Sequence, residues 1–271
     1  RGSFGPFNVA LLLASVFGAG LFLLAEKRTA SPLIHLAMFR NLALTSSLAT
    51  SMLVSTVMMA TLVVGPFYLS RTLGLDAAHV GLVLSVGPLV AALIAVPAGR
   101  MADRFGPPRM ITMGLLGMTA GAFTLSMLPT ILGIPGYVAP IVVLTASYAL
   151  FQTANNTNVM TDVGPDQRGA ISGMLNLSRN LGLITGASVM GAVFALASAT
   201  TDVTTARPEA VASGMRMTFS VAAALLVVAL AIAAGAYRRT LRDQKLVPED
   251  VRRPGFTKRR PSSIAGHSAT L

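Results

Sequence analysis

The chain has 271 residues, of which 53% are hydrophobic and only 11% are charged, and its mean hydropathy is +0.68. Soluble domains carry about 25% charged residues, so this composition excludes an ordinary soluble protein and indicates an integral membrane protein. The formal charge of +11 does not indicate a nucleic-acid-binding protein, because the basic residues lie between apolar runs and in the C-terminal tail, and the absence of cysteine excludes disulfides and thiolate metal sites.

Seven long apolar runs predict seven transmembrane helices, because a helix needs about 20 apolar residues to cross a bilayer core. We therefore expect an all-α integral membrane protein. The predicted spans are Phe4–Leu24, Leu42–Ser70, Val80–Ala98, Met110–Leu128, Tyr137–Met160, Gly169–Ser198 and Gly214–Ala236.

The segments beside these spans carry their own signals. Residues 31–41 are short and amphipathic, which predicts a helix lying at the membrane surface. Gly65-Pro66 predicts a kink near the end of the second span, and Asp76 is expected to cap the helix that follows. Residues 237–271 hold nine Lys and Arg residues against three acids, and we expect this basic tail to be disordered.

Glycines in the fourth predicted span indicate close helix packing. Gly117 and Gly121 stand four residues apart, the spacing at which small residues let two membrane helices approach. Two interpretations stay open: a gliding surface between moving bundles, or static packing against one neighbour.

A charged segment of eleven residues, Gly99–Arg109, separates the third and fourth spans. We expect it to be a tight loop, because Gly99 and Gly106 permit turning and Pro107-Pro108 stops one helix before the next. The three arginines of this loop place it on the cytoplasmic side by the positive-inside rule.

The distribution of basic residues orients the whole chain. With the tail in the cytoplasm, sixteen Lys and Arg residues fall on the cytoplasmic side and four on the outer side. This excess predicts an outer N-terminus, a cytoplasmic C-terminus and a multi-pass protein of the cell membrane.

Enzyme chemistry has no support inside the spans. No Asp or Glu lies within any of the seven, and the three histidines, His35, His79 and His267, lie outside them or at their margins. Paired-carboxylate catalysis and metal binding are therefore not expected, and no cofactor is predicted.

Two polar clusters within the spans are candidate cavity residues. Gln152, Asn155 and Asn156 lie within about 100° of one another on the fifth span, and Asn176 and Arg179 share a face of the sixth. An arginine near the bilayer centre costs about 2.5–3.5 kcal/mol on insertion scales, so Arg179 should face a polar cavity or a partner. A substrate path and a purely structural role both stay open.

The charged segment resembles a signature of the major facilitator superfamily. Gly99, Ala102, Asp103, Arg104 and Gly106 match its glycine, small residue, Asp-Arg and second glycine. Pro107-Pro108 replaces the usual basic pair, and Arg109 follows alone. By this resemblance, Gly99, Asp103, Arg104, Gly106 and Arg109 form a cytoplasmic gating loop.

Further stretches are similar to the second half of the drug:proton antiporter-2 branch, whose members have fourteen helices. These stretches are Pro32-Leu-Ile, Phe39-Arg-Asn41, Gly65-Pro-Phe-Tyr-Leu69, Gly74–Gly81, Arg168–Asn176 and Arg179-Asn-Leu-Gly182. The resemblance implies a linker transmembrane helix in residues 1–30, an interfacial segment in 31–41, a C-terminal six-helix transporter bundle in 42–236 and a basic tail in 237–271.

The resemblance implies proton-coupled multidrug efflux by alternating access, with an amphiphilic drug-like substrate, protons and the lipid bilayer as partners. The chain starts at Arg1 rather than methionine, so we expect an N-terminal half that carries the coupling carboxylates. The alternatives are a facilitator carrier for another small solute and a non-transporting half-molecule that assembles with other membrane proteins.

Overall fold

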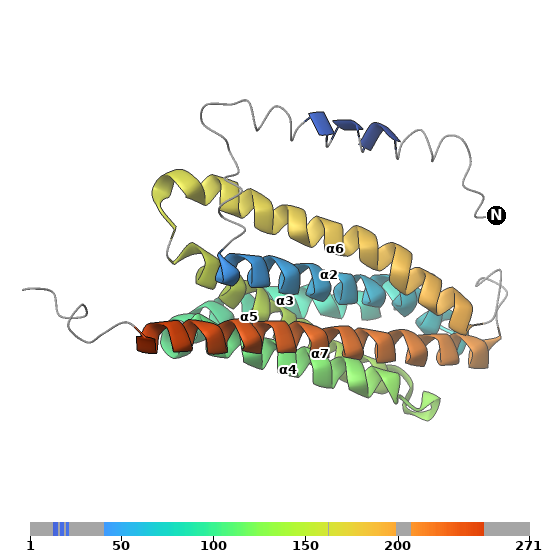
Figure 1. Cartoon of the computed structure of the whole chain (residues 1–271). Coiled ribbons are helices and arrows are strands. Elements are labelled where there is room, and N and C mark those ends of the chain that lie inside the picture. Colours follow the sequence, from blue (N-terminus) through green and yellow to red (C-terminus); the bar gives the residue numbers. More distant parts are fainter. Residues whose placement is uncertain are drawn as a thin grey trace, which may run out of the picture.

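A computed structural model describes residues 13–15, 17, 18, 20, 21, 41–161, 163–198 and 207–246, with the side chains of 240, 241 and 243–246 not described. All the regular structure in this part of the chain is helical (Figure 1). The elements are α2 (Leu42–Phe67), the π-helix η2 (Tyr68–Thr72), α3 (Ala77–Phe105), α4 (Pro107–Ser126), the 3₁₀-helix η3 (Thr130–Leu132), α5 (Gly133–Met160), the 3₁₀-helix η4 (Pro165–Gln167), α6 (Arg168–Ala197) and α7 (Pro208–Leu246).

The six later apolar runs correspond to helices α2 to α7. Within the described residues, five helical segments are long and apolar enough to cross a membrane: Leu42–Thr72, Ala77–Phe105, Thr130–Met160, Pro165–Ala197 and Pro208–Arg239. Helix α4 is shorter, with 20 residues, and its apolar part is shorter still because it begins with Pro107, Pro108 and Arg109. Most of the first predicted span, Phe4–Leu24, and nearly all of the interfacial segment 31–41 lie outside the described residues.

Local signals in the sequence set the helix starts. The Oδ1 atom of Asn41 accepts hydrogen bonds from the backbone N–H groups of Ala43 and Leu44 at 2.9 and 3.3 Å and caps α2. Asp76 caps α3 by accepting from the N–H of His79 at 2.9 Å, as its position predicted. At Gly65-Pro66 the α-helix continues only to Phe67 and then widens into a π turn, an adjustment that a proline ring commonly forces on the helix around it.

The expectation that Gly99–Arg109 forms a loop is wrong. Helix α3 continues through the charged residues to Phe105, Gly106 alone leaves the helical conformation with φ +84°, and α4 begins at Pro107. Glycine just after a helix and proline at the first position of the next make this one-residue junction possible. Because α3 has 29 residues, its charged end extends beyond the roughly 30 Å of a bilayer core at about 1.5 Å per residue.

The basic tail is also more ordered than expected at its start. Residues 237–246 continue α7 without a break, because leucine, arginine, glutamine and lysine are good helix formers. The rest of the predicted tail lies outside the described residues.

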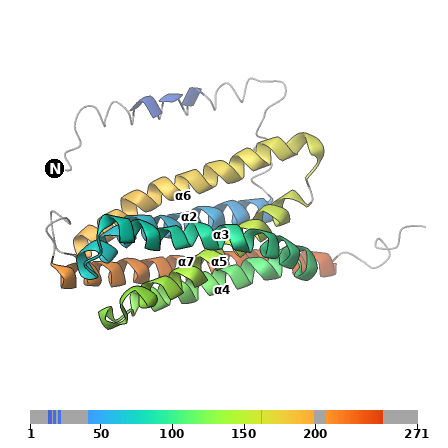
Figure 2. The same ribbon diagram turned by 180° about the vertical axis from the view of Figure 1, so that it is seen from behind.

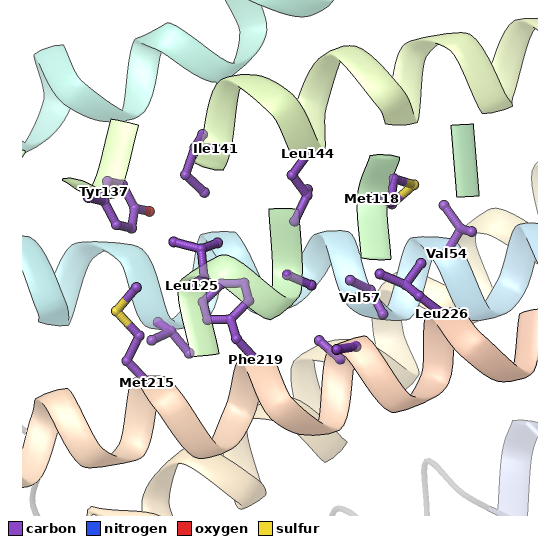
Figure 3. Close-up of a cluster of buried hydrophobic side chains, with 14 of the residues drawn as sticks. Val54, Val57, Met118, Leu125, Tyr137, Ile141, Leu144, Met215, Phe219 and Leu226 are labelled. Carbon is purple, nitrogen blue, oxygen red and sulfur yellow. The ribbon is translucent and has the colours of Figure 1, made fainter. Parts of the chain in front are cut away.

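Four helices enclose the hydrophobic core. Helix α4 packs between α5 and α7, and α2 packs against α6 and α7 (Figures 1 and 2). Figure 3 shows side chains of α2, α4, α5 and α7 meeting at the centre, and Val57, Met118, Leu144, Phe219 and Leu226 are fully buried there. Helix α3 packs mainly on α5 and leaves most of its apolar surface exposed.

Glycines of α4 bring α4 and α5 close together. A Cβ atom on Gly114 would lie 2.8 Å from Phe151, and one on Gly121 would lie 3.1 Å from the Pro140 carbonyl oxygen of α5. Gly117 faces Ser147 of the same helix. These glycines of α4 therefore pack against one neighbour, α5, and their small size allows the two backbones to approach where no hydrophobic effect drives association.

Candidate functional site

A pocket of about 280 Å³ opens between α2, α3 and α5, with one residue from α6. Its walls are mainly aliphatic, and the polar groups among them are the hydroxyls of Thr61, Thr145, Tyr137 and Tyr148. The other lining residues are Met58, Leu62, Val83, Leu84, Gly87, Pro88, Ala91, Ile141 and Leu183. Such a lining suits an apolar molecule that carries a few hydrogen-bonding groups.

The small residues of α3 leave space on this side of the bundle. A Cβ atom on Gly87 would meet only the Thr145 hydroxyl, at 3.8 Å, so the absence of a side chain at Gly87 leaves the space beside Thr145 open. Pro88 has no N–H, so the carbonyl of Leu84 loses its donor within the helix and keeps spare acceptor capacity. Both glycine and proline are tolerated in a membrane helix where neighbours or a cavity satisfy the backbone.

Helix α5 presents its polar residues along one stripe. Tyr148, Gln152 and Asn155 follow each other at spacings of four and three residues, so the predicted amides continue the face that lines the pocket. Asn155 is 2% exposed and donates from Nδ2 to the Ser47 carbonyl oxygen at 3.4 Å. Its Oδ1 atom is buried and has no hydrogen-bond partner among the described residues. A buried acceptor without a hydrogen-bond donor costs free energy unless another conformation or a bound molecule supplies a donor.

The other two amides are more exposed than Asn155. Gln152 and Asn156 are half-buried, and Asn156 borders a separate open hollow with Thr157, Met160 and Arg168. The predicted amide cluster is therefore divided between two places. Asn155 lies in the interface between α2 and α5, while Asn156 lies at the end of the bundle where α6 begins.

The predicted pair on α6 is also divided. Arg179 is half-buried and lies close enough to Tyr148 for its charge to act on that phenol. Asn176 is exposed and is bonded to Asn180 of its own helix at 3.5 Å. No described carboxylate pairs with Arg179, and no described hydrogen bond joins it to the amides of α5. Arg179 therefore lies near the pocket residue Tyr148 without lining the pocket itself, and Asn176 is not part of the pocket lining.

The charged junction between α3 and α4 lies far from the pocket. Asp103 is sixteen residues beyond Gly87 on one continuous helix, which is about 24 Å. Asp103, Arg104 and Arg109 are exposed, and within the described part of the chain none of them forms an ion pair. The Arg104 guanidinium lies 5.4 Å from the ring centre of Phe105. Gly99 is half-buried, with open space where a Cβ would lie.

Several pocket residues were not predicted. Thr145 and Tyr148 could have been found by extending the stripe of Gln152 towards the N-terminus of α5, and Pro88 by its place inside an apolar run. Tyr137 gave no such signal in the sequence. In the structure its ring stacks on that of Tyr68, with ring centres 5.7 Å apart. The buried Tyr68 hydroxyl has no hydrogen-bond partner among the described residues.

Comparison with known proteins places this arrangement in context. The family model of the Major Facilitator Superfamily matches residues 2–187. The uncharacterized transporter YebQ of Escherichia coli strain K12 is 30% identical over 183 residues, which are 67% of this chain and 40% of YebQ.

Two further relatives have names that state an activity. The multidrug efflux pump LfrA of Mycolicibacterium smegmatis is 24% identical, over 68% of this chain and 37% of LfrA. The quinolone resistance protein NorB of Staphylococcus aureus strain MRSA252 is 26% identical, over 73% of this chain and 43% of NorB. The chain spans about two fifths of the length of these curated relatives.

Proposed function

Because the chain belongs to the Major Facilitator Superfamily and is a multi-pass membrane transporter rather than an enzyme, we propose that it forms the C-terminal part of a proton-coupled exporter of amphiphilic, drug-like molecules. The observation that carries this proposal is the pocket between α2, α3 and α5, with its aliphatic walls and four hydroxyl groups. The names of LfrA and NorB support the same substrate class.

The pocket forms one wall of the substrate site. Its volume of about 280 Å³ lies just below the roughly 300–1,000 Å³ that encloses a drug-sized ligand. A second bundle facing α2, α3, α5 and α6 would complete the enclosure, as in secondary transporters whose site lies between two repeats. The aliphatic side chains exclude water from the apolar part of the substrate, and Thr145 and Tyr148 offer it hydrogen bonds.

Arg179 sets the charge at this site. A guanidinium without an acidic partner in the described residues gives the neighbourhood of Tyr148 a positive potential, at a cost of about 2.5–3.5 kcal/mol on insertion scales. Its role is to pair with an acidic group of the opposite bundle in one conformational state. The unpartnered Oδ1 of Asn155 is a second group that a rearrangement of the bundle would satisfy.

The α3–α4 junction serves as the cytoplasmic gate. Asp103 and Arg104, at the end of α3, are exposed and form no ion pair among the described residues, so their charges are free to contact the opposite bundle. Gly99 gives close access to the backbone beside them, and Gly106 fixes the direction in which α4 departs. Contact in one state and release in the other gives alternating access between the two sides of the membrane.

Proton coupling requires a group that titrates inside the membrane. None of the predicted spans contains Asp, Glu or His. The coupling carboxylates therefore belong to the N-terminal half of the transporter, and the C-terminus of this chain lies in the cytoplasm.

The test is dye efflux from bacteria that lack their own pumps and express the complete reading frame containing this chain. We expect the protein to lower ethidium accumulation and a protonophore to abolish the effect. Gly87→Leu directs a side chain towards Thr145 and should reduce efflux at least tenfold, whereas Gly81→Leu, on the same helix with no atom near its Cβ, should not. Equal accumulation with and without the protein, or full efflux by Gly87→Leu, would contradict the proposal.

A further inference from the structure

Helix α7 is longer than a membrane crossing requires. Its 39 residues extend over about 58 Å, compared with roughly 30 Å for a bilayer core. The apolar span ends at Arg239, and the helix continues to Leu246 without a break. The charged residues after the span are therefore held at fixed positions on a helix.

The basic residues of this extension share one side of the helix. Arg238, Arg239, Arg242 and Lys245 fall within an arc of roughly 120° at 100° per residue. The side chains of Arg238, Arg239 and Arg242 are exposed, and within the described residues they form no ion pair. Tyr237, 41% exposed, stands just before them at the level where aromatic residues meet a membrane interface.

The start of α4 adds a further charge at the same end of the bundle. Helices α4 and α7 are antiparallel neighbours, so Arg109 and the C-terminal part of α7 lie at one end (Figure 1). We call Arg109, Arg238, Arg239 and Arg242 the basic ledge. Asp103 and Asp166 are the acids of the described side chains at this end, and neither pairs with the ledge.

Apolar surface continues from the ledge on both helices. On α4, Met113 and Leu116 follow Arg109 at spacings of four and seven residues and are 53% and 51% exposed. On α7, Val227 and Val228 precede the arginines by three turns and are 53% and 49% exposed. Each helix therefore presents a cationic end above an apolar stripe.

We propose that the basic ledge binds the phosphate headgroups of anionic phospholipids, whose acyl chains lie on the exposed apolar stripes of α4 and α7. An anionic head joined to apolar tails is the chemistry that this arrangement matches, and clusters of arginine next to a membrane span attract anionic lipids. A nucleic acid or an acidic protein would use the charges but would leave the stripes without a partner. The bound lipids would hold the end of α7 at the membrane surface.

The experiment compares two phospholipids for the purified protein. Native mass spectrometry measures the ratio of bound phosphatidylglycerol to bound phosphatidylcholine from equimolar mixtures in detergent. We expect the wild type to prefer phosphatidylglycerol and the triple variant Arg238→Gln, Arg239→Gln, Arg242→Gln to lose at least about tenfold of that preference. The corresponding lysine variant should retain most of it.

The opposite end of the bundle supplies a matched control. Arg71, Arg207 and Arg216 are three exposed arginines whose change to glutamine removes the same charge. This control should keep the lipid preference, and both triple variants should melt near the wild-type temperature. An equal loss in both variants, no preference in the wild type, or displacement of the lipid by millimolar inorganic phosphate would overturn the proposal.

Discussion

The hydroxyl of Thr56 on α2 donates a hydrogen bond of 3.0 Å to the carbonyl oxygen of Gly182 on α6, where the two backbones come into near contact. A Cβ atom on Gly182 would overlap the Met52 carbonyl oxygen, and one on Gly186 would lie 2.5 Å from the Thr56 carbonyl oxygen. Close to these glycines, Ser178 donates to the Leu48 carbonyl oxygen at 2.6 Å. Small residues and interhelical hydrogen bonds thus act together to attach α6 to α2.

Gly182→Ala should weaken this attachment. The added methyl group meets backbone rather than a flexible side chain, so α6 must move, and overpacking of this kind costs about 1–3 kcal/mol. We expect a lower melting temperature of the purified protein, measured by loss of the monodisperse peak after heating. Gly173→Ala on the same helix has no atom within 4 Å of the new Cβ and should melt like the wild type. Equal melting temperatures for the two variants would show that α6 can move away from α2 at little cost, which would contradict this prediction.

The two glycines of the α3–α4 junction should respond differently to alanine. Gly106 has φ +84°, a conformation that costs a residue with a Cβ about 1–3 kcal/mol, so Gly106→Ala should destabilise the protein. Gly99 is helical and has open space around it, so Gly99→Ala should leave stability unchanged or raise it by up to about 1 kcal/mol. Thermal melting of both variants in one detergent checks this difference. If Gly106→Ala melts at the wild-type temperature, the junction adapts and its backbone conformation is not required.

Acid should remove the cap of α3. Hydrogen bonds from the backbone and side chain of His79 hold the pKa of Asp76 below its ordinary value of 3.8. The carboxylate therefore stabilises the folded state at pH values above its ordinary pKa, and this contribution is lost as the pH falls through the lowered pKa. Asp76→Asn keeps a capping oxygen that does not titrate. Melting between pH 6 and pH 3 should fall less steeply for Asp76→Asn than for the wild type; parallel curves would contradict the assigned role.

Asp103→Asn should impair transport without destabilising the protein. The carboxylate is exposed and has no ion pair among the described residues, so its removal should not shift the melting temperature. If the Asp103 carboxylate contributes about 1.4 kcal/mol to a contact between the two bundles, its loss would reduce efflux about tenfold in cells expressing the complete reading frame. Asp166→Asn removes an exposed acid at the same end and should transport normally. Normal efflux by Asp103→Asn would mean that the charge is not part of the gate.

The sequence by itself determined the features that depend on neighbours along the chain. Apolar runs located α2 to α7, Asp76 was recognised as a cap, and the residues around Asp103 identified the family that the comparisons confirmed. Hydropathy, capping and turn chemistry act over a few residues, so they can be read directly. The same approach misjudged the junction, because the flanking Gly99 and Pro107 were taken to break a helix that the residues between them support.

Only the tertiary structure decided how each helix is turned about its axis. In a soluble bundle the polar face of a helix marks the outside, but in a membrane the outer face is apolar too, so the pattern of α3 or α6 does not tell which residues meet a neighbour. This is why Asn155 is buried against Ser47 while Asn176 is exposed, although both were predicted for one cavity. The pocket, whose lining includes Gly87, Thr145 and Leu183, brings together residues of four helices through contacts that no local pattern encodes.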